Sequence, residues 1–516
     1  MNYDIFENKN VLVFMPHEDD EINTVYGLLY NIKNIASSIK VVYSTNGNYI
    51  VKDKYRQKEG IKSLNVIGIK EEDIIFMGYS DQIPEGSTHL YHENKLWKDK
   101  FGNYKTKSYY KKEYHYEKYN EHGVFNKENF IKDIEEIIID NKPDIIFCID
   151  FDSHPDHRAL SLSFEIALGR VLKTNLNYHP KVFKSFAYPT SYKTISDYNI
   201  NNPETKFIKE KNSLSELQNP YYDWQERIIF KNTLFASNYL YLKNIYFWGL
   251  LKHKSQYILN RINEIINSDL VFFERNTYNL LNDTKNITVS SGNASYLNDF
   301  LLFDVDNILG GTEKVPVVNN NFTIIKKDDK DKKIEITFNS SKNIDIIKIY
   351  VKPNCTIDNI KISYNNKNIK INWELNNNIY IIRNLNIKNT NNLKIEFGNK
   401  KDIFIGELEI LESENITTYA YLSINDSIYN KYYVKDKYEL NIKSNDKNIN
   451  KYKIIKNNNK VYLMYNDNII DKLILKKKYK ILINIETIIN KITLFIGRVY
   501  QKLVKEIRKC INWFDN

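Results

Sequence analysis

The sequence is poor in cysteine, glycine and proline, and it contains no long apolar run. Its three cysteines, Cys148, Cys355 and Cys510, lie far apart and show no Cys-X-X-Cys spacing, which excludes the disulfide framework of a small secreted domain. The segment 1–10 lacks the basic start of a signal peptide. No stretch reaches the roughly 18 apolar residues that would span a bilayer. We therefore expect a soluble protein in the reducing cytoplasm.

Histidine is absent from the second half of the chain. All nine histidines lie at or before His253, so any imidazole chemistry belongs to the first half. The excess of basic residues is small, because 74 Lys and Arg stand against 64 Asp and Glu, a net charge of +10. This excess forms no concentrated basic face with a nucleic-acid-reading motif, so we expect no nucleic-acid partner.

The length of 516 residues predicts about three or four domains rather than a single core. In the first half, short apolar runs alternate with helical stretches. The runs cover residues 11–14, 39–43, 74–77 and 145–149, and helices are predicted through Leu28 and Leu29, over 55–67 and over 126–139. This alternation predicts an α/β domain, over residues 1–275, whose parallel sheet is covered on both faces.

The hydrophobic period changes to two from about residue 276. Strands are predicted at 333–338, 344–351, 369–373 and 393–397, separated by turns at the spacing of a β-sandwich. We therefore expect a β-sandwich over 276–411 and a small β domain over 412–486.

The last segment, 487–516, is predicted to be a basic amphipathic helix. Its apolar residues recur at helical spacing: Ile492, Ile496, Val499, Leu503, Ile507, Ile511 and Phe514. A neighbouring stripe is basic: Arg498, Lys502, Lys505 and Lys509. Two interpretations stay open. The helix docks on the protein's own body or a sister subunit, or it attaches reversibly to an anionic membrane surface.

A first polar constellation, residues 16–21, follows the strand at 11–14, where open α/β sheets collect ligands. His17 and Asp20 are three residues apart at a helix start and can converge on one ion. Asp19 is then left to handle a proton. The alternative interpretation is an acidic helix start that interacts with the helix dipole.

A second constellation, residues 150–157, follows the strand at 145–149 and contains His154, Asp156 and His157. Either constellation alone is compatible with loop polarity. Together they offer three N/O ligands with an open fourth position, as in a hydrolytic zinc centre: His17, Asp20 and His157. These ligands do not separate Zn2+ from Fe2+. The segment 78–81 also follows a strand and is expected to face the site.

These residues together resemble the N-acetylglucosaminylphosphatidylinositol deacetylase-like superfamily, also called PIG-L or LmbE-like, over about residues 8–250. The motifs in order are Pro16-His17-Glu18-Asp19-Asp20-Glu21, Thr45-Asn46-Gly47, Arg56-X-X-Glu59 with Gly68, and His154-Pro155-Asp156-His157. The resemblance implies a Rossmann-like fold and zinc-dependent removal of an N-acetyl group from a glucosamine unit. Glu18 departs from the many members that have proline there.

Carried over position by position, the resemblance implies three zinc ligands, His17, Asp20 and His157. Asp19 would act as general base, His154 would steady the oxyanion, and Asp156 would orient a neighbouring imidazole. Arg56 would hold polar groups of the substrate, and Asn46 would also bind it. The β-sandwich is loosely similar to discoidin or galactose-binding-like modules.

The expected function is therefore cytoplasmic, metal-dependent N-deacetylation of an N-acetylglucosamine-type glycoconjugate, such as a lipid-linked precursor of a cell-surface polymer. The expected location is the cytoplasm, including the inner face of the cell membrane. Two alternatives stay open. One is a non-catalytic glycan-binding protein on a retained deacetylase scaffold, and the other is a deacetylase of a small thiol glycoside.

Overall fold

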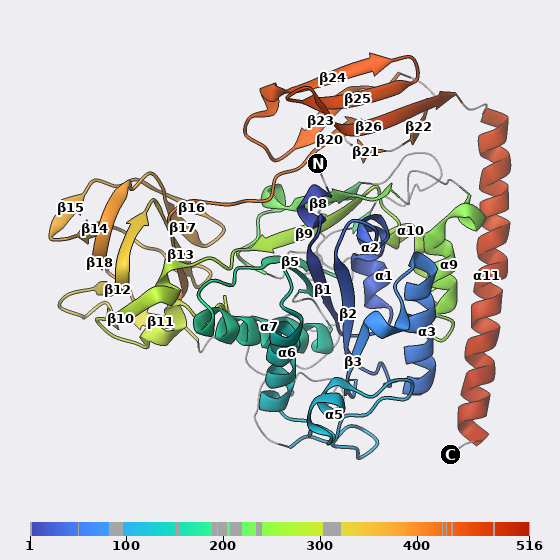
Figure 1. Ribbon diagram of the computed structural model, residues 1–516, viewed down its shortest axis with the longest axis horizontal. Helices are drawn as coiled ribbons and strands as arrows, with labels where there is room; N and C mark the ends of the chain where they lie inside the picture. Colours follow the sequence, from blue (N-terminus) through green and yellow to red (C-terminus); the bar gives the residue numbers. More distant parts are fainter. Residues whose placement is uncertain are drawn as a thin grey trace.

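The computed structural model describes residues 3–514 except 50, 82–95, 151, 153, 188–192, 195–203, 207–218, 234–239, 303–320, 426, 430, 435, 436, 478 and 479. Four parts follow one another along the chain: an α/β layer structure, a β-sandwich, a smaller β region and a long helix (Figure 1). This order agrees with the predicted fold class.

The α/β part is built on a seven-stranded sheet. Its strands lie in the order β3 (Ile74–Tyr79), β2 (Ser38–Thr45), β1 (Asn10–Met15), β4 (Ile145–Ile149), β5 (Lys181–Ser185), β9 (Asp269–Arg275) and β8 (Ile228–Lys231). The first five strands are parallel, which confirms the prediction. Strands β9 and β8 extend the sheet in antiparallel fashion, which the sequence pattern did not predict.

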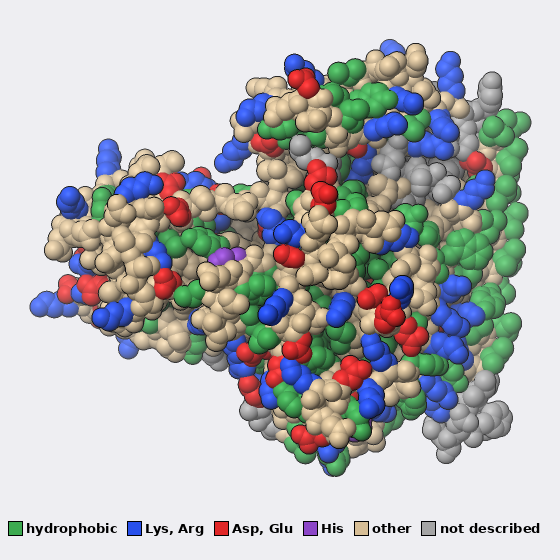
Figure 2. Space-filling model, in the orientation of Figure 1, with side chains coloured by type: hydrophobic (Ala, Val, Ile, Leu, Met, Phe, Trp, Pro, Cys, Tyr) green, Lys and Arg blue, Asp and Glu red, His purple; other side chains and the backbone are tan. Residues whose placement is uncertain are grey.

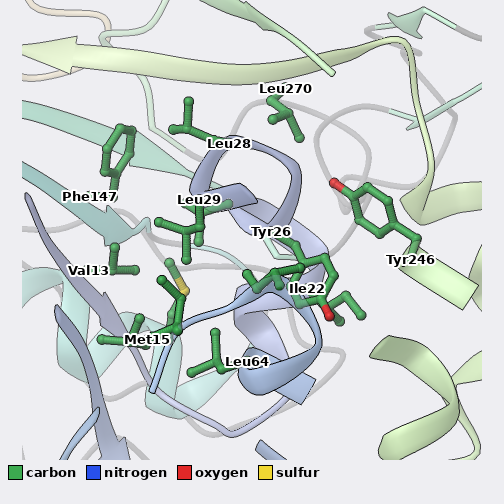
Figure 3. Close-up of a cluster of buried hydrophobic side chains, with 14 of the residues drawn as sticks. Val13, Met15, Ile22, Tyr26, Leu28, Leu29, Leu64, Phe147, Tyr246 and Leu270 are labelled. Atoms are coloured by element: carbon green, nitrogen blue, oxygen red, sulfur yellow. The ribbon is translucent and has the colours of Figure 1, made fainter. Parts of the chain in front are cut away.

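Helices cover both faces of this sheet. One face carries α1 (Asp20–Thr24), α2 (Tyr26–Ile32), α3 (Asp53–Ile67) and α9 (Ile245–Lys252), and the other carries α6 (Lys127–Asn141) and α7 (Pro155–Thr174). Because side chains alternate along a strand, Val13 and Met15 of β1 enter the first core and Leu12 and Phe14 the second. Figure 3 shows Val13 and Met15 facing Leu29 of α2.

Smaller helices complete this part of the chain. They are α5 (Tyr114–Tyr119) and α10 (Ile262–Ile265), with short 3-10 turns that include η5 (Tyr241–Lys243) and η6 (Ile258–Arg261). A two-stranded ladder pairs β6 (Lys193–Thr194) with β7 (Thr205–Lys206).

The sandwich has two antiparallel sheets packed around one apolar core. One sheet has the order β10 (Thr284–Val289), β12 (Lys333–Ile344), β18 (Ile387–Phe397), β14 (Ile360–Tyr364) and β15 (Lys367–Ile369). The other has the order β11 (Thr323–Ile325), β19 (Ile403–Leu411), β13 (Ile346–Val351), β17 (Ile379–Ile382) and β16 (Trp373–Asn376).

The predicted strand at 369–373 is wrong. The chain leaves the first sheet at Ile369 and enters the second at Trp373, so the residues between them cross from one sheet to the other. Their apolar alternation reflects packing at the sandwich edge, where Ile371 is partly buried against the core.

A smaller β region and the terminal helix follow. The smaller β region has two sheets. The first has the order β21 (Ser427–Ile428), β20 (Ala420–Ile424) and β23 (Leu440–Ser444). The second has the order β22 (Lys431–Val434), β26 (Asn468–Lys477), β25 (Lys460–Tyr465) and β24 (Tyr452–Asn457). Helix α11 (Lys480–Phe514) begins before the predicted position 487. Strands β9 and β19 end at Arg275 and Leu411, next to the predicted limits, and the division into domains stays a prediction.

The α/β core predicts a stability effect at Phe147 of β4. This ring is buried among Phe6, Phe183 and Phe272, with centroid distances of 6.1, 5.3 and 5.1 Å. Phe147→Ala should lower the free energy of unfolding by about 3–5 kcal/mol, because it leaves a cavity among rings that cannot close up. Urea unfolding followed by circular dichroism measures this change.

The matched control is Phe101→Ala, since Phe101 is 61% exposed. It should change the free energy of unfolding by no more than about 0.5 kcal/mol. Equal effects of the two substitutions would contradict the packing described for the sheet.

Candidate active site

The site is assembled where two neighbouring parallel strands end. Strands β1 and β4 pair in register, with Phe14 opposite Cys148, so the loops that follow them emerge side by side. The carbonyl of Pro16 accepts hydrogen bonds from the N–H and the hydroxyl of Thr45, both at 2.9 Å, which ties the first loop to the end of β2. Helix α1 then begins at Asp20, and helix α7 begins at Pro155.

Two imidazoles from these two loops converge on one carboxylate. Asp20 Oδ2 lies 2.9 Å from His17 Nδ1 and 3.3 Å from His157 Nε2. The side chains of His17, Asp20 and His157 are 6%, 2% and 0% exposed, so the cluster is shielded from bulk water. The structure thus brings together the three residues predicted as metal ligands.

His154 lies beside the same cluster. Its ring centroid is 4.7 Å from that of His17 and 4.7 Å from that of His157. One ring nitrogen from each of these histidines lies within 4.8 Å of the others, a spacing at which they can hold a metal ion. The donor atoms are imidazole nitrogens and carboxylate oxygens, which suit a divalent transition metal. The residues therefore fit a metal centre.

A second group of donor atoms shares His17. Its Nε2 lies 3.1 Å from Asp156 Oδ2 and 3.2 Å from Asp81 Oδ1, and these groups with His154 also lie within 4.8 Å of one another. Asp156 thus contacts an imidazole, and its predicted role in orienting one stays a prediction. The expectation that segment 78–81 faces the site is confirmed by Asp81.

Two polar side chains of the cluster remain open to solvent. Asp19 and His154 each keep 19% of their side-chain surface exposed. His154 caps helix α7, and its Nδ1 accepts a hydrogen bond from the backbone N–H of Asp156 at 3.2 Å. A substrate that approaches from solvent therefore meets Asp19 and His154 first.

Arg56 of helix α3 fixes Asp19. Its Nη2 donates to Asp19 Oδ1 at 2.8 Å, and its Nε lies 3.6 Å from Glu18 Oε2. Burial raises the pKa of Glu18 to about 8 although Arg56 opposes this shift. Gly47 has a φ of +57°, and a Cβ there would come within 2.4 Å of Arg56 Nε, so this position requires glycine.

The two predicted substrate-binding residues are both buried. Arg56 is 4% exposed and faces the carboxylate of Asp19. Asn46 donates to the carbonyls of Gly78 and Lys107 at 3.1 and 3.0 Å and accepts a hydrogen bond from Gln57 at 2.9 Å. Substrate binding by either residue stays a prediction, and their contacts here are with the protein itself.

Mutual proximity sets the charge of these groups. Burial alone would lower the pKa of His17, but neighbouring carboxylates, above all Asp81, raise it well above the usual value. Burial disfavours an ionised Asp20, yet His157 and His17 hold its pKa well below the usual range. Burial and the two other imidazoles lower the pKa of His154, so this ring is neutral at pH 7. The site therefore combines a carboxylate that stays ionised with a neutral histidine.

Sequence reasoning assigned no role to Asp152. Its Oδ2 lies 2.7 Å from His157 Nδ1, and its Oδ1 accepts from the backbone N–H of His154 at 2.8 Å. It therefore turns the other nitrogen of His157, Nε2, toward Asp20. Asp152 is one of several acids in the second constellation, and only the folded loop distinguishes it from its neighbours.

The chain is remotely similar to solved deacetylase structures. N,N'-diacetylchitobiose deacetylase from Pyrococcus horikoshii is 18% identical, with 33% of this chain and 52% of that chain covered and a TM-score of 0.22. The zinc-inhibited form of teicoplanin deacetylase Orf2 is 12% identical, with 52% and 98% covered and a TM-score of 0.27.

The sandwich region has similarities of the same kind. CpGH89CBM32-6 from Clostridium perfringens is 20% identical, with 26% of this chain and 99% of that chain covered and a TM-score of 0.18. Each of these three TM-scores is below 0.5. No curated protein sequence matches the chain significantly.

A family match covers the part of the chain that carries the site. The model of the PIG-L family, described as GlcNAc-PI de-N-acetylase, matches residues 12–167. This range includes every residue of the cluster, from His17 to His157. Residues 12–167 therefore match a PIG-L family domain, and this domain contains a His/Asp cluster able to hold a metal ion.

Proposed function

We propose that the protein is a metal-dependent N-deacetylase that releases acetate from an N-acetylglucosamine-type sugar of a glycoconjugate. One observation carries this proposal. Within a PIG-L domain, His17, Asp20 and His157 converge at the carboxyl ends of β1 and β4. Asp19 and His154 lie beside them and are partly exposed to solvent. This is the arrangement of a shielded metal centre next to an accessible acid–base pair.

His17, Asp20 and His157 would hold the cation, for which Zn2+ and Fe2+ both suit the donor set. When bound, such a cation polarises the amide carbonyl and acidifies a water molecule. Asp152 holds His157 with Nε2 toward Asp20, which pre-orients the cluster for binding.

Asp19 would move the proton. As the water oxygen bonds to the acetamide carbon, Asp19 accepts the water's proton, and it then delivers this proton to the nitrogen as the C–N bond breaks. Acetate and a free amino sugar result. The ion pair with Arg56 fixes the direction of the Asp19 carboxylate, so the base is in place before the substrate arrives.

His154 would stabilise the negative charge on the carbonyl oxygen. Its ring is neutral at pH 7, and its Nδ1 is already the acceptor of a backbone hydrogen bond. The ring proton therefore lies on Nε2, which is the donor that an oxyanion needs.

A glycan-binding protein without catalysis would need no proton acceptor at this site. Asp19 is nevertheless held in place by the buried Arg56, as a proton acceptor would be. We favour the enzyme on this ground. The proposed substrate is a glycoconjugate rather than a small thiol glycoside, because a sandwich and a further β region accompany the deacetylase domain.

The first test of this function is Asp19→Asn. The amide cannot accept a proton, so acetate release from N-acetylglucosamine glycosides should fall by about 10²–10⁴-fold. The content of bound zinc, measured by elemental analysis, should not change. Glu72→Gln is the matched control, because Glu72 is 71% exposed and distant in sequence from both motifs. Full activity of Asp19→Asn would contradict the proposed role.

The second test separates metal binding from proton transfer. Asp152→Asn should weaken zinc binding about 10–100-fold, because a ligating histidine loses the carboxylate that orients it. Competition with a fluorescent chelator measures the affinity. Excess zinc should restore acetate release to Asp152→Asn but not to Asp19→Asn. Unchanged zinc affinity in Asp152→Asn would show that His157 is not a ligand.

A further inference from the structure

Helix α11 packs on the α/β domain through Leu494, which joins the first apolar core, and through buried polar side chains. Asn490 accepts a hydrogen bond from the backbone N–H of Tyr241 at 2.9 Å. Gln501 donates to the carbonyl of Leu250 at 2.8 Å and accepts from the N–H of Leu259 at 3.3 Å. Both side chains are fully or almost fully buried. A helix on a globular surface normally buries its apolar stripe instead.

The apolar stripe of α11 faces solvent. We call it the outer stripe: Ile481, Leu482, Ile485, Ile488, Ile489, Ile492, Phe495, Ile496, Val499, Tyr500, Leu503 and Ile507. Each of these side chains is 37–68% exposed. Figure 2 shows them as a continuous apolar band along the edge of the molecule that α11 occupies in Figure 1. Contiguous exposed patches of this kind mark interaction surfaces.

Basic residues border the outer stripe on one side. At 100° per residue, Lys491, Arg498, Lys502 and Lys505 share a sector between the outer stripe and the packed face. Lysine and arginine side chains lie beside the apolar band in Figure 2. The helix carries seven basic residues against two acidic ones, Glu486 and Glu506. A partner that matches this surface is apolar in depth and anionic at its surface.

We propose that the outer stripe docks the protein on an anionic lipid surface, with α11 lying in the plane of the membrane. At 100° per residue, the outer stripe covers about 140° around the helix axis. This is wider than the narrow seam of a coiled coil, which disfavours a second copy as the partner. A broad apolar face bordered by lysine and arginine is typical of interfacial helices. Within the described ranges, no helix is long and apolar enough to cross a bilayer.

Docking would also place the candidate site near the lipid. Near its C-terminal end, α11 contacts α3, where Arg508 forms an ion pair with Glu59 and stacks over Tyr55. The same helix supplies Arg56 to the site.

Sedimentation of the full-length protein with vesicles tests the docking without reference to activity. Binding should be strongest to phosphatidylcholine vesicles that contain phosphatidylglycerol, weaker to phosphatidylcholine alone, and weaker still to vesicles with a cationic lipid. The substitutions K491Q and K502Q each remove one positive charge, and each should weaken binding to the anionic vesicles about fivefold. A wild-type protein that stays in the supernatant with every vesicle would overturn the proposal.

Variants of the outer stripe locate the contact. The combined change Ile492→Gln, Phe495→Gln and Val499→Gln should weaken binding at least about 100-fold, because three buried apolar groups are lost. The matched control makes the same exchange at exposed apolar residues of other elements: Leu375, Ile455 and Ile469, which are 54%, 49% and 59% exposed. The control should bind vesicles as the wild type does.

Two results would reject the lipid as partner. One is equal vesicle binding by the outer-stripe variant and the control. The other is a wild-type protein that sediments as a dimer, an outer-stripe variant that sediments as a monomer, and no vesicle binding by either. This result would assign the outer stripe to a contact with a second copy of the chain. Should the triple variant fail to fold by circular dichroism, Phe495→Gln alone decides the question. A wild-type protein that binds vesicles but releases no acetate from N-acetylglucosamine substrates would reject only the proposed enzyme.

Discussion

The candidate site depends on one pairing, that of the parallel strands β1 and β4. Their register places Phe14 beside Cys148, so the loops that carry His17 and His157 leave the sheet next to each other. His17 and His157, 140 positions apart in the sequence, thereby share the carboxylate of Asp20, at 2.9 and 3.3 Å. A shift of register by one residue would turn the flanking side chains to the wrong face and separate these groups.

Burial of so many ionisable groups is tolerable because each has a partner of opposite charge or a hydrogen bond. Asp19 has Arg56, His157 has Asp152, and Asp20 has two imidazoles. The same arrangement leaves Asp19 and His154 as the groups that reach solvent. The buried candidate ligands and the accessible acid–base groups are thus consequences of the same loops, and the proposed hydrolysis requires both.

The alternation of short apolar runs with helical stretches predicted the parallel sheet, and its strands are apolar throughout because Val13 and Phe14 enter cores on opposite faces. Motif spacing predicted the convergence of His17, Asp20 and His157. Neither signal reports which acid orients a given ring, so the role of Asp152 emerged only from the folded loop. The hydrophobic period of a sequence also cannot show which side of an amphipathic helix contacts the protein. Gln501 and Phe495 both belong to α11, and the polar Gln501 is buried whereas Phe495 is exposed.

The proposed function requires one divalent cation held by His17, Asp20 and His157. A crystal structure of the zinc-loaded protein, with anomalous data at the zinc edge, tests it most directly. We expect one strong peak within bonding distance of these three side chains, with Asp19 beside it. A peak surrounded instead by His17, Asp81, His154 and Asp156, or no peak in this cluster, would contradict it.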